Sequence, residues 1–312
     1  MRFLILGAGA TGGYFGARLA AAGADVTFLV RDRRRGQLAA RGLTVKSGFG
    51  DFNAQVKTIT QSDDLKGYDI VMLSCKAYDL EAAIDAIRPA VGAQTLVLPL
   101  LNGIKHLDAL DAAFGRERVL GGSCHLSVTL DAEGTIHHLN KLHLLTFGPR
   151  EPGQAASCKT LLGIFQAANF DTKLRDDVMQ AMWDKWVLLA SLASLTCLFR
   201  ASVGDIASAA GGRDLMLAQI EECRAVAAAN GYEPSDEHMK TIGSLLTDPA
   251  SPVVASMLRD MQKGSRIEAD LIIGDMLARG RAKGIATPLL AIANTNVLCY
   301  ESQRLLAASA GA

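Results

Sequence analysis

Cysteines are few in this sequence, and none of them has the spacing of a metal or redox motif. The 312 residues include six scattered cysteines and no C-x-x-C pair. Such usage is typical of a reduced chain and argues against a disulfide framework or a zinc module. No carboxylate or cysteine completes a ligand set around the histidines, so we expect no metal site.

An excess of charge of either sign is also lacking. Lysine and arginine together number 32, and so do aspartate and glutamate. This balance argues against a protein whose main work is binding nucleic acid or an anionic membrane surface. We therefore expect neither nucleic acid nor a membrane as a partner, although the balance is compatible with a small basic pocket.

Long apolar runs are the third absence. No run approaches the roughly 20 apolar residues that are needed to span a bilayer. The amino-terminal MRFLILGAGA is apolar, but glycines interrupt it and it lacks the cleavage pattern of a secretory signal. We expect a soluble, cytoplasmic protein.

The apolar residues that are present suffice for two folded domains. Hydrophobic residues make up 49% of the chain, and its length is that of about two domains. In the first half, the strand-like runs RFLILG, ADVTFLVRD, YDIVMLSCK and TLVLPLLNG alternate with helical segments such as DLEAAIDAIRPAV. This alternation predicts an α/β fold, a Rossmann-like doubly wound parallel sheet with helices on both faces. The stretch GLTVKSGFGDFNAQVKTI predicts paired short strands appended to that sheet.

The second half has a different pattern. A helical segment, SCKTLLGIFQAANF, and a short strand-like piece complete the first half. From about residue 176, long stretches rich in Ala, Leu and Met have helical periodicity. We predict a Rossmann-like domain over residues 1–175 and an all-α domain over residues 176–312.

A glycine-rich stretch, GAGATG, follows the first predicted strand and opens the first predicted helix. Gly7 permits a tight turn, Gly9 lets the backbone approach a pyrophosphate, and Gly12 lets helix and strand pack closely. The helix N-terminus adds free N–H groups and a partial positive charge for phosphates. The alternative is a glycine-rich turn that only packs. Strand, loop and helix together favour a dinucleotide-binding loop that consists of Gly7, Ala8, Gly9, Ala10, Thr11 and Gly12.

The end of the second strand indicates which dinucleotide binds. An NAD site has an acidic residue there for the ribose 2′-hydroxyl, whereas an NADP site has an arginine for the 2′-phosphate. The sequence reads VRDRRR, and Arg31 comes first, with a fork of donors that suits a phosphate. We predict NADP, as NADPH. We also interpret Arg33 to Arg35 as a solvated helix start that Asp32 caps.

Two further polar residues end predicted strands. Lys76 ends YDIVMLSCK, and Asn102 ends the apolar run TLVLPLLNG before its glycine. Because ligands lie across the carboxyl ends of the strands in a doubly wound sheet, these residues extend the predicted site. Each by itself could be an ordinary surface residue.

A lysine in one of the most apolar stretches of the chain, AMWDKWVLLASLASLTC, needs an explanation. Lys185 lies between Trp183 and Trp186, the two tryptophans of the protein. Lysines are rarely buried, and on an amphipathic helix they usually extend their charged end to water. The other interpretation is a catalytic acid, because burial lowers the pKa of a lysine toward neutral pH.

Several motifs together resemble one family. They are GAGATGG at the start, CKA at residues 75–77, NG at residues 102–103, WDKW, SM and RIEADLIIG. In this order, and over nearly the whole chain, they resemble the ketopantoate reductase (2-dehydropantoate 2-reductase) family. The resemblance implies an NADP-binding Rossmann domain joined to a helical domain. It also implies the reduction of ketopantoate to pantoate with NADPH, on the route to pantothenate and coenzyme A.

The resemblance also assigns roles to residues. Lys185 matches the catalytic lysine, which also binds substrate, and Glu268 matches the active-site glutamate, which also contacts the cofactor. During hydride transfer negative charge grows on the carbonyl oxygen, and a cation hydrogen-bonded to that oxygen stabilises the charge and can supply the proton. A carboxylate can hold the ammonium in line. The remaining matches are Ser256 for substrate, Lys76, Asn102 and the backbone of Leu126 for the cofactor, and Arg31 for the 2′-phosphate.

The match fails at three substrate-binding positions. The family has asparagines four and eight positions after the lysine, on one helix face, and another in the turn after that helix. Here these positions are Leu189, Ala193 and Val203. The loss of such hydrogen bonds changes substrate preference by orders of magnitude.

These residues leave several functions open. The leading one is an NADPH-dependent 2-oxo acid reductase, which acts on a small molecule and is a monomer or a homodimer. Its substrate is ketopantoate or, for a paralogue, a different and more apolar 2-oxo acid. The rival is a non-catalytic NADP-binding sensor of the same fold. A third function is that of a related hydroxy-acid or sugar-acid dehydrogenase that runs toward oxidation.

The histidines give weaker signals. His125 follows the strand-like VLGGSC and could edge the cofactor site. His137, His138 and His143 lie in TIHHLNKLHLL, whose strand alternation predicts the surface of a hairpin and not metal ligands.

Overall fold

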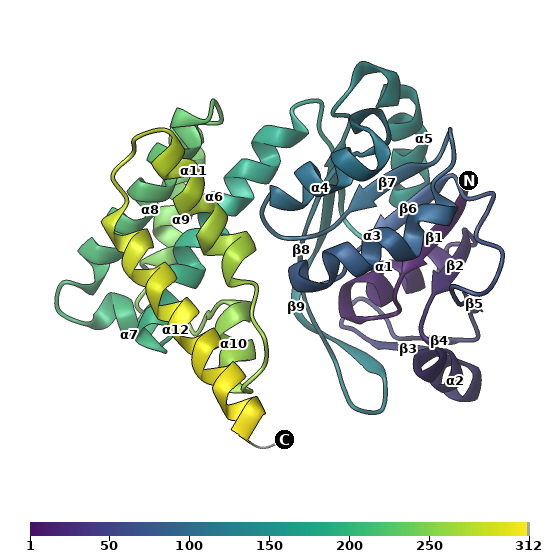
Figure 1. Ribbon diagram of the computed structural model, residues 1–312, viewed down its shortest axis with the longest axis horizontal. Coiled ribbons are helices and arrows are strands. Elements are labelled where there is room, and N and C mark those ends of the chain that lie inside the picture. The colour runs from purple at the N-terminus through teal and green to yellow at the C-terminus, as the bar shows by residue number, and fades with distance from the viewer. Residues whose placement is uncertain (311–312) are drawn as a thin grey trace. The chain divides into compact units, whose positions relative to one another are not determined.

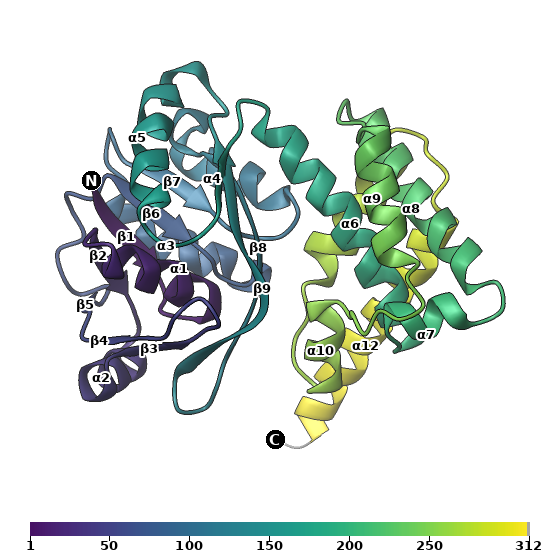
Figure 2. The ribbon, with the colours of Figure 1, turned by 180° about the vertical axis from the view of Figure 1, so that it is seen from behind.

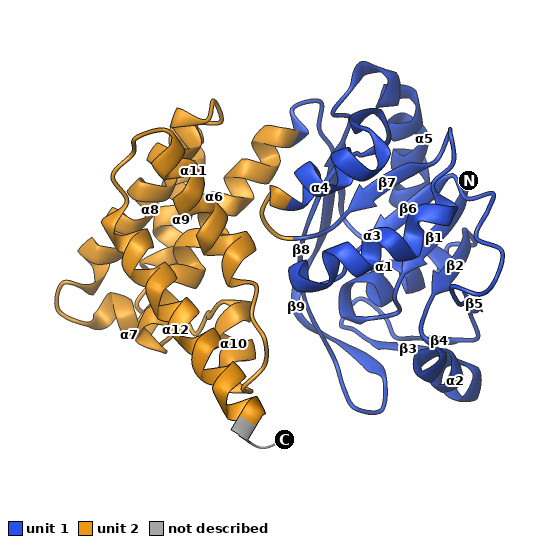
Figure 3. Cartoon of the chain, in the orientation of Figure 1, with its two compact units in different colours: residues 1–101, 106–178 blue, residues 102–105, 179–312 orange. Residues whose placement is uncertain are grey.

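The chain folds into two compact units, and the computed structural model describes residues 1–310. The first unit consists of Met1–Leu101 and His106–Val178 (Figure 3). The second consists of Asn102–Lys105 and the chain from Met179 onward. The short segment Asn102–Lys105, which follows the last parallel strand, is therefore part of the helical unit. Nothing in the sequence indicates that this segment belongs to the helical unit.

The first unit contains the predicted parallel sheet. Its strands have the order β5-β2-β1-β6-β7, and every neighbouring pair is parallel. The chain builds outward from β1 on one side and then crosses to β6 on the other, so the order reverses between β1 and β6. Open α/β sheets bind ligands at the carboxyl ends of the strands at this point. The strands are β1 (Arg2–Leu6), β2 (Asp25–Leu29), β5 (Lys57–Ile59), β6 (Ile70–Leu73) and β7 (Leu96–Pro99).

A second, mixed sheet belongs to the same unit. Its long strand β9 pairs with β8 antiparallel and with β3 and β10 parallel, and β3 pairs with β4 antiparallel. The sequence correctly predicts β3 and β4 as paired short strands, whereas β5 from the same stretch joins the parallel sheet. The strands are β3 (Leu43–Lys46), β4 (Phe52–Ala54), β8 (Gly121–Leu130), β9 (Thr135–Gly148) and β10 (Thr172–Leu174).

Helix α1 (Ala10–Ala21) contacts strands of both sheets and is buried over most of its length. Helix α5 (Ala155–Gln166), labelled in Figure 2, packs against β9 and β10, and its Phe165 meets Phe147 of β9 edge to face. Because α1 packs against strands of both sheets, its first turn, next to the glycine loop, is held in place. The other helices are α2 (Asp32–Arg41), α3 (Leu80–Ile87) and α4 (Lys105–Phe114), with the 3-10 turns η1 (Ala77–Asp79), η2 (Arg88–Ala90), η3 (Arg116–Arg118) and η4 (Pro152–Gln154).

The second unit is helical, as the sequence predicts (Figure 1). Helix α6 (Val178–Phe199) contains both tryptophans, and the long helix α12 (Pro288–Ala310), yellow in Figure 1, ends the described chain. Before α11 the chain makes one wide turn, the π-helix η5 (Asp270–Gly274). The remaining helices are α7 (Val203–Ser208), α8 (Gly212–Ala229), α9 (Asp236–Leu246), α10 (Ser256–Gln262) and α11 (Asp275–Ala282).

Helix α6 corrects one expectation from the sequence. By length and composition it could cross a membrane, and it is the one such helix among residues 1–310. However, 67% of its apolar window is buried inside the protein. A long apolar helix whose surface is mostly buried in this way is typical of the core of a globular unit.

Candidate functional site

The glycine loop joins β1 to α1 with the geometry that its glycines predict. Gly7 has a φ of +81°, a conformation that strains any residue with a Cβ. Its N–H donates to the carbonyl oxygen of Leu29 at 2.8 Å, which ties the loop to β2. A Cβ on Gly12 would lie 2.9 Å from the carbonyl oxygen of Gly7 and 2.6 Å from Ser74 Oγ. Helix and strand approach this closely only because Gly12 has no side chain.

The amino end of α1 has room for a ligand. Gly9 is the N-cap residue, and no side chain caps the helix. Apart from its two chain neighbours, no part of residues 1–310 lies within 4 Å of the position that a Cβ on Gly9 would take. The N–H groups of the first turn are therefore not used by a capping side chain, and the helix dipole favours an anion there. A pyrophosphate fits this cradle.

Lys76 lies near the switch point of the sheet. It follows β6, the strand beside β1, and the closeness of Ser74 to Gly12 shows that the chain after β6 runs next to the glycine loop. Lys76 is half-buried and precedes η1 as its N-cap residue. The prediction that it ends the strand is wrong, because β6 ends at Leu73. It instead stands in the loop beyond.

Arg31 lies two residues beyond the end of β2 at Leu29 and is the N-cap residue of α2, with an exposed side chain. Among residues 1–310, no hydrogen bond or ion pair uses its guanidinium. The prediction that Asp32 caps α2 is wrong. Asp32 is the first residue of the helix, and its carboxylate pairs with Arg35 at 3.0 Å. Arg31 is thus available to an anion at the end of β2.

The structure gives Arg34 a role that the sequence does not predict. The sequence predicts a solvated side chain, but Arg34 is half-buried. Its Nε donates to the carbonyl oxygen of Ala8 at 3.1 Å, and a terminal nitrogen donates to that of Gly134 at 3.1 Å. Burial lowers the pKa of Arg34. Arg34 therefore braces the glycine loop from α2. Arg34 stands one helical turn after Arg31, and this spacing indicates that the two share a helix face. Because Arg33, Arg34 and Arg35 are consecutive arginines, the sequence does not single out Arg34.

Strand β8 contains the predicted backbone contact at Leu126. Leu126 lies opposite His143, and the register shifts between Leu126 and Val128, so the ladder between β8 and β9 is irregular there. The N–H of Ser127 instead donates to Asn140 Oδ1 at 3.3 Å. An interruption of this kind releases backbone groups from the ladder. His125, half-buried on the same strand, lies one residue before Leu126.

His143 corrects the expectation of a hairpin surface, because it is only 4% exposed. Its Nδ1 lies 2.9 Å from the hydroxyl of Tyr14, and its ring stacks on Phe49 with 3.7 Å between the centroids. Burial lowers the pKa of His143. His137 is different, since its partly exposed ring pairs with Asp131 at 2.7 Å. Within residues 1–310, no group of three His, Cys, Asp or Glu side chains could hold a metal ion.

In the helical unit, Lys185 of α6 is only 7% exposed. Its Nζ donates to Asn102 Oδ1 at 3.1 Å. An amide oxygen orients an ammonium group and adds no charge of its own. Asn102 lies beyond β7, which ends at Pro99, so the prediction that it ends the strand is wrong. The structure thus brings together two predicted residues from distant parts of the chain.

Glu268 and Ser256 occupy different places in this unit. Glu268 is 8% exposed and precedes η5, and its carbonyl oxygen accepts from the N–H of Ile272 at 3.1 Å. Ser256 is exposed and begins α10, which the N–H of Ala255 ties to Thr196 Oγ1 of α6 at 3.3 Å. From Lys185 to Thr196 is about 16 Å along α6. The connection through Thr196 therefore does not pair Ser256 with Lys185.

The face of α6 that follows Lys185 is apolar. Leu189 is half-buried and Ala193 is 2% exposed, at the spacing that places both on the Lys185 face. The sequence predicts Val203 in a turn, but this residue opens α7 and is fully buried. None of the three positions offers an amide side chain.

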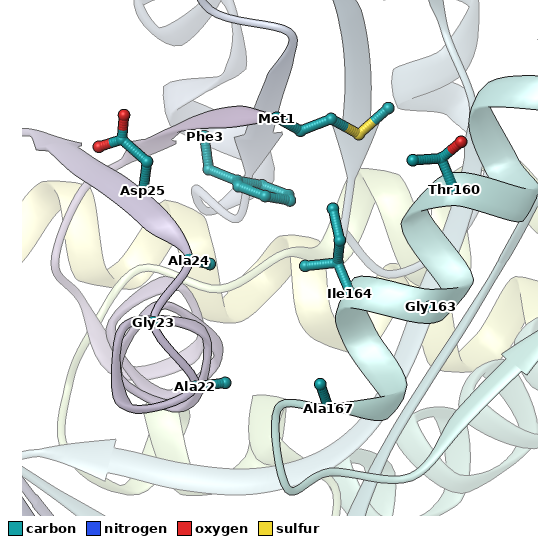
Figure 4. Close-up of a pocket in the computed structure, with 10 residues that line it drawn as sticks. All are labelled: Met1, Phe3, Ala22, Gly23, Ala24, Asp25, Thr160, Gly163, Ile164 and Ala167. Carbon is teal, nitrogen blue, oxygen red and sulfur yellow. The ribbon is translucent and has the colours of Figure 1, made fainter.

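A surface cavity of about 590 Å³ lies elsewhere in the first unit (Figure 4). Met1, Phe3 and Asp25 line it from the beginnings of β1 and β2, and Ile164 lines it from α5. Because open α/β sheets bind ligands at the carboxyl ends of their strands, a cavity at the amino ends is not the dinucleotide site.

Comparison with known proteins gives the same result for both halves of the chain. Residues 3–152 match the family described as ketopantoate reductase PanE/ApbA. Residues 177–297 match the ketopantoate reductase PanE/ApbA C-terminal family.

Individual relatives cover nearly the whole chain. The uncharacterized oxidoreductase YkpB of Bacillus subtilis (strain 168) is 32% identical over 305 residues, which cover 97% of this chain and 100% of YkpB. The structure of 2-dehydropantoate 2-reductase from Geobacter metallireducens GS-15 has a TM-score of 0.87 at 30% identity, with 95% of this chain and 98% of the other covered. D-mandelate dehydrogenase with NADH and anilino(oxo)acetate has a TM-score of 0.88 over 97% and 99% of the two chains, but its 22% identity shows the fold alone.

Proposed function

The chain belongs to the ketopantoate reductase family of oxidoreductases, and from this premise we propose that it reduces a 2-oxo acid to the 2-hydroxy acid with NADPH. The observation that carries the proposal is the hydrogen bond from the buried Lys185 ammonium to Asn102, at 3.1 Å. A lysine oriented in this way is suited to a carbonyl oxygen that gains negative charge. We place the protein in the cytoplasm.

The residues of the chain divide the work of the reaction. A bound nicotinamide would supply the hydride to the carbonyl carbon. Lys185 donates a hydrogen bond to the carbonyl oxygen and then gives it a proton, while Asn102 keeps the ammonium in place. With Lys185 only 7% exposed, water screens this interaction weakly. We assign Glu268 the role of holding the ammonium or the product hydroxyl in line.

The proposal also specifies the cofactor as NADPH and not NADH, and Arg31 supports this choice. Its exposed guanidinium follows β2, where a 2′-phosphate is recognised in folds of this kind. D-mandelate dehydrogenase, which has the same fold, contains NADH in its structure. The choice between the two cofactors therefore depends on Arg31 and not on the fold.

The first candidate substrate is 2-dehydropantoate, on which the Geobacter relative acts by name. Its reduction gives pantoate, the precursor of pantothenate and coenzyme A. The second candidate is a more apolar 2-oxo acid. Leu189 and Ala193 favour it, because the helix face beside Lys185 has no group at these positions that could bond a substrate hydroxyl.

The experiment is NADPH oxidation by the purified protein with a panel of 2-oxo acids. The panel includes 2-dehydropantoate, branched aliphatic acids and a phenyl-substituted acid. We expect turnover with at least one member. Tight NADPH binding with no turnover across the panel would favour the non-catalytic sensor.

Leu189→Asn distinguishes the two substrate candidates. An amide at this position adds a hydrogen-bond partner for the hydroxyl of 2-dehydropantoate, so kcat/KM for this acid rises about tenfold relative to the apolar acids. The matched control is Leu198→Asn, because Leu198 is also half-buried but lies on the opposite face of α6. An equal change in both variants would remove Leu189 from the substrate site.

A further inference from the structure

Three residues with proposed roles in the helical unit have a common neighbour. Lys185 is followed by Trp186, Asn102 is followed by Gly103, and Glu268 lies just before the π-helix η5. Both of these following residues contact η5. Trp186, Gly103 and the backbone of Glu268 each contact η5, and these three contacts fix Lys185, Asn102 and Glu268 in turn.

Trp186 fixes α6 at the position of Lys185. Its indole Nε1–H donates to the carbonyl oxygen of Ile272 at 2.9 Å, and the side chain is fully buried. A buried donor that loses its acceptor is costly, so this bond holds the helix in one rotation. Lys185 is the adjacent residue on the helix, and its direction depends on that rotation.

Gly103 fixes the segment that contains Asn102. It has a φ of +68°, and an added Cβ would lie 2.8 Å from the carbonyl oxygen of Leu271 and 3.6 Å from Trp186 Nε1. No side chain fits there. Lys105 Nζ also pairs with Asp270 at 2.6 Å, but both side chains are largely exposed, so this ion pair adds little.

Glu268 is held by the first turn of the same element. The N–H of Ile272 donates to the carbonyl oxygen of Glu268 at 3.1 Å, and the carbonyl oxygen of Ile272 accepts from Trp186. One residue of η5 thus connects Glu268 to the helix of Lys185. A π-helix is a wide, rare turn that occurs frequently at functional sites.

We propose that η5 positions the Lys185–Asn102 pair and Glu268, and that Trp186 and Gly103 are positioning residues that act through it. The catalytic consequence rests on the proposed function. The orientation of Lys185 does not, so it can be measured without a substrate.

The first test compares the two tryptophans. Trp186→Phe removes the donor to Ile272 and keeps an aromatic ring. Trp183→Phe is the matched control, because Trp183 is 1% exposed and its Nε1 has no hydrogen-bond partner within residues 1–310. The readout is the rate at which acetic anhydride acetylates Lys185, followed by mass spectrometry. We expect the rate to rise about fivefold in Trp186→Phe and to stay unchanged in Trp183→Phe.

The second test compares two glycines with a similar positive φ. Gly103→Ala forces a Cβ against Leu271. Gly284 has a φ of +70°, and beyond its chain neighbours nothing in the described part of the chain lies within 4 Å of an added Cβ. Both glycines have a similar positive φ that strains a residue with a Cβ, so thermal stability falls in both variants. Lys185 acetylation rises only in Gly103→Ala. Equal acetylation rates within each pair of variants would overturn the proposal.

Kinetics separate this inference from the proposed function. With an accepted 2-oxo acid, Trp186→Phe lowers kcat about fivefold and leaves the KM for NADPH unchanged, while Trp183→Phe changes neither. Retained turnover in Lys185→Ala would overturn the proposed function, yet the acetylation rates would still decide whether η5 positions Lys185. If Lys185→Ala loses turnover but the two tryptophan variants have equal kcat, the positioning role of η5 would be overturned and the proposed function would stand.

Discussion

The glycine loop of the first unit and the lysine pair of the second are assembled in opposite ways. The loop is one continuous stretch, Gly7 to Gly12, and it offers backbone N–H groups at a helix end. The lysine pair joins Lys185 and Asn102, which are 83 positions apart, through their side chains. A local backbone site depends on residues that must lack side chains, whereas a distant pair depends on residues that must have them.

This difference predicts a division of function. Changes in the loop should alter cofactor binding, and changes around Lys185 should alter turnover. Gly12→Ala and Arg31→Ala test the loop, and Lys185→Ala tests the lysine pair.

The largest effect on cofactor binding is expected for Gly12→Ala. Its Cβ would stand 2.9 Å from the backbone carbonyl oxygen of Gly7, which cannot move without opening the loop. We expect the Kd for NADPH, measured by fluorescence titration, to rise about a hundredfold. The control is Gly36→Ala, because, outside its own helix backbone and chain neighbours, nothing in the described chain lies within 4 Å of a Cβ at Gly36. Unchanged affinity in Gly12→Ala would contradict the assignment of the loop.

A smaller and more selective effect is expected for Arg31→Ala. The exposed guanidinium is available to the 2′-phosphate, and charge-assisted hydrogen bonds are strong. The Kd for NADPH should rise about thirtyfold, while that for NADH changes little. Arg33→Ala, also at an exposed position of the same segment, serves as the control. An equal loss with both cofactors would end the 2′-phosphate assignment.

The same difference explains how much could be predicted from the sequence. The strand, loop and helix around Gly7 are determined by neighbouring residues. The pattern of apolar residues and the spacing of the glycines therefore predicted them. The bond from Arg34 to Ala8 and the burial of His143 under Phe49 depend on how separate strands and helices pack. The place of Asn102 in the helical unit also depends on tertiary structure. Lys185 could be selected from the sequence because of its apolar surroundings and the family resemblance, but its partner could not be selected from spacing.

The smallest effect concerns His143, a buried residue of the first unit that lies outside the loop. Burial lowers its pKa below the usual value of 6.5, so the unfolded chain binds a proton more readily than the folded one. Stability is therefore full above about pH 6.5 and falls as the pH decreases toward the pKa of the folded state, by at most about 1.4 kcal/mol per pH unit. Thermal unfolding between pH 5 and pH 8 measures this slope.

His143→Gln provides the comparison, because glutamine does not titrate in this range. We expect the variant to be less stable at pH 8 and to depend less on pH than the natural chain. Parallel pH profiles for the two proteins would show that His143 is not the group responsible.

The division between the two regions is tested most directly on one preparation of Lys185→Ala. NADPH affinity and the rate of NADPH oxidation with an accepted 2-oxo acid are measured side by side with the natural chain. We predict that kcat falls about a thousandfold, as for the loss of a general acid, while the Kd for NADPH stays within about twofold of that of the natural chain. Retained turnover, or a loss of affinity as large as the loss of kcat, would show that function is not divided between the two regions in this way.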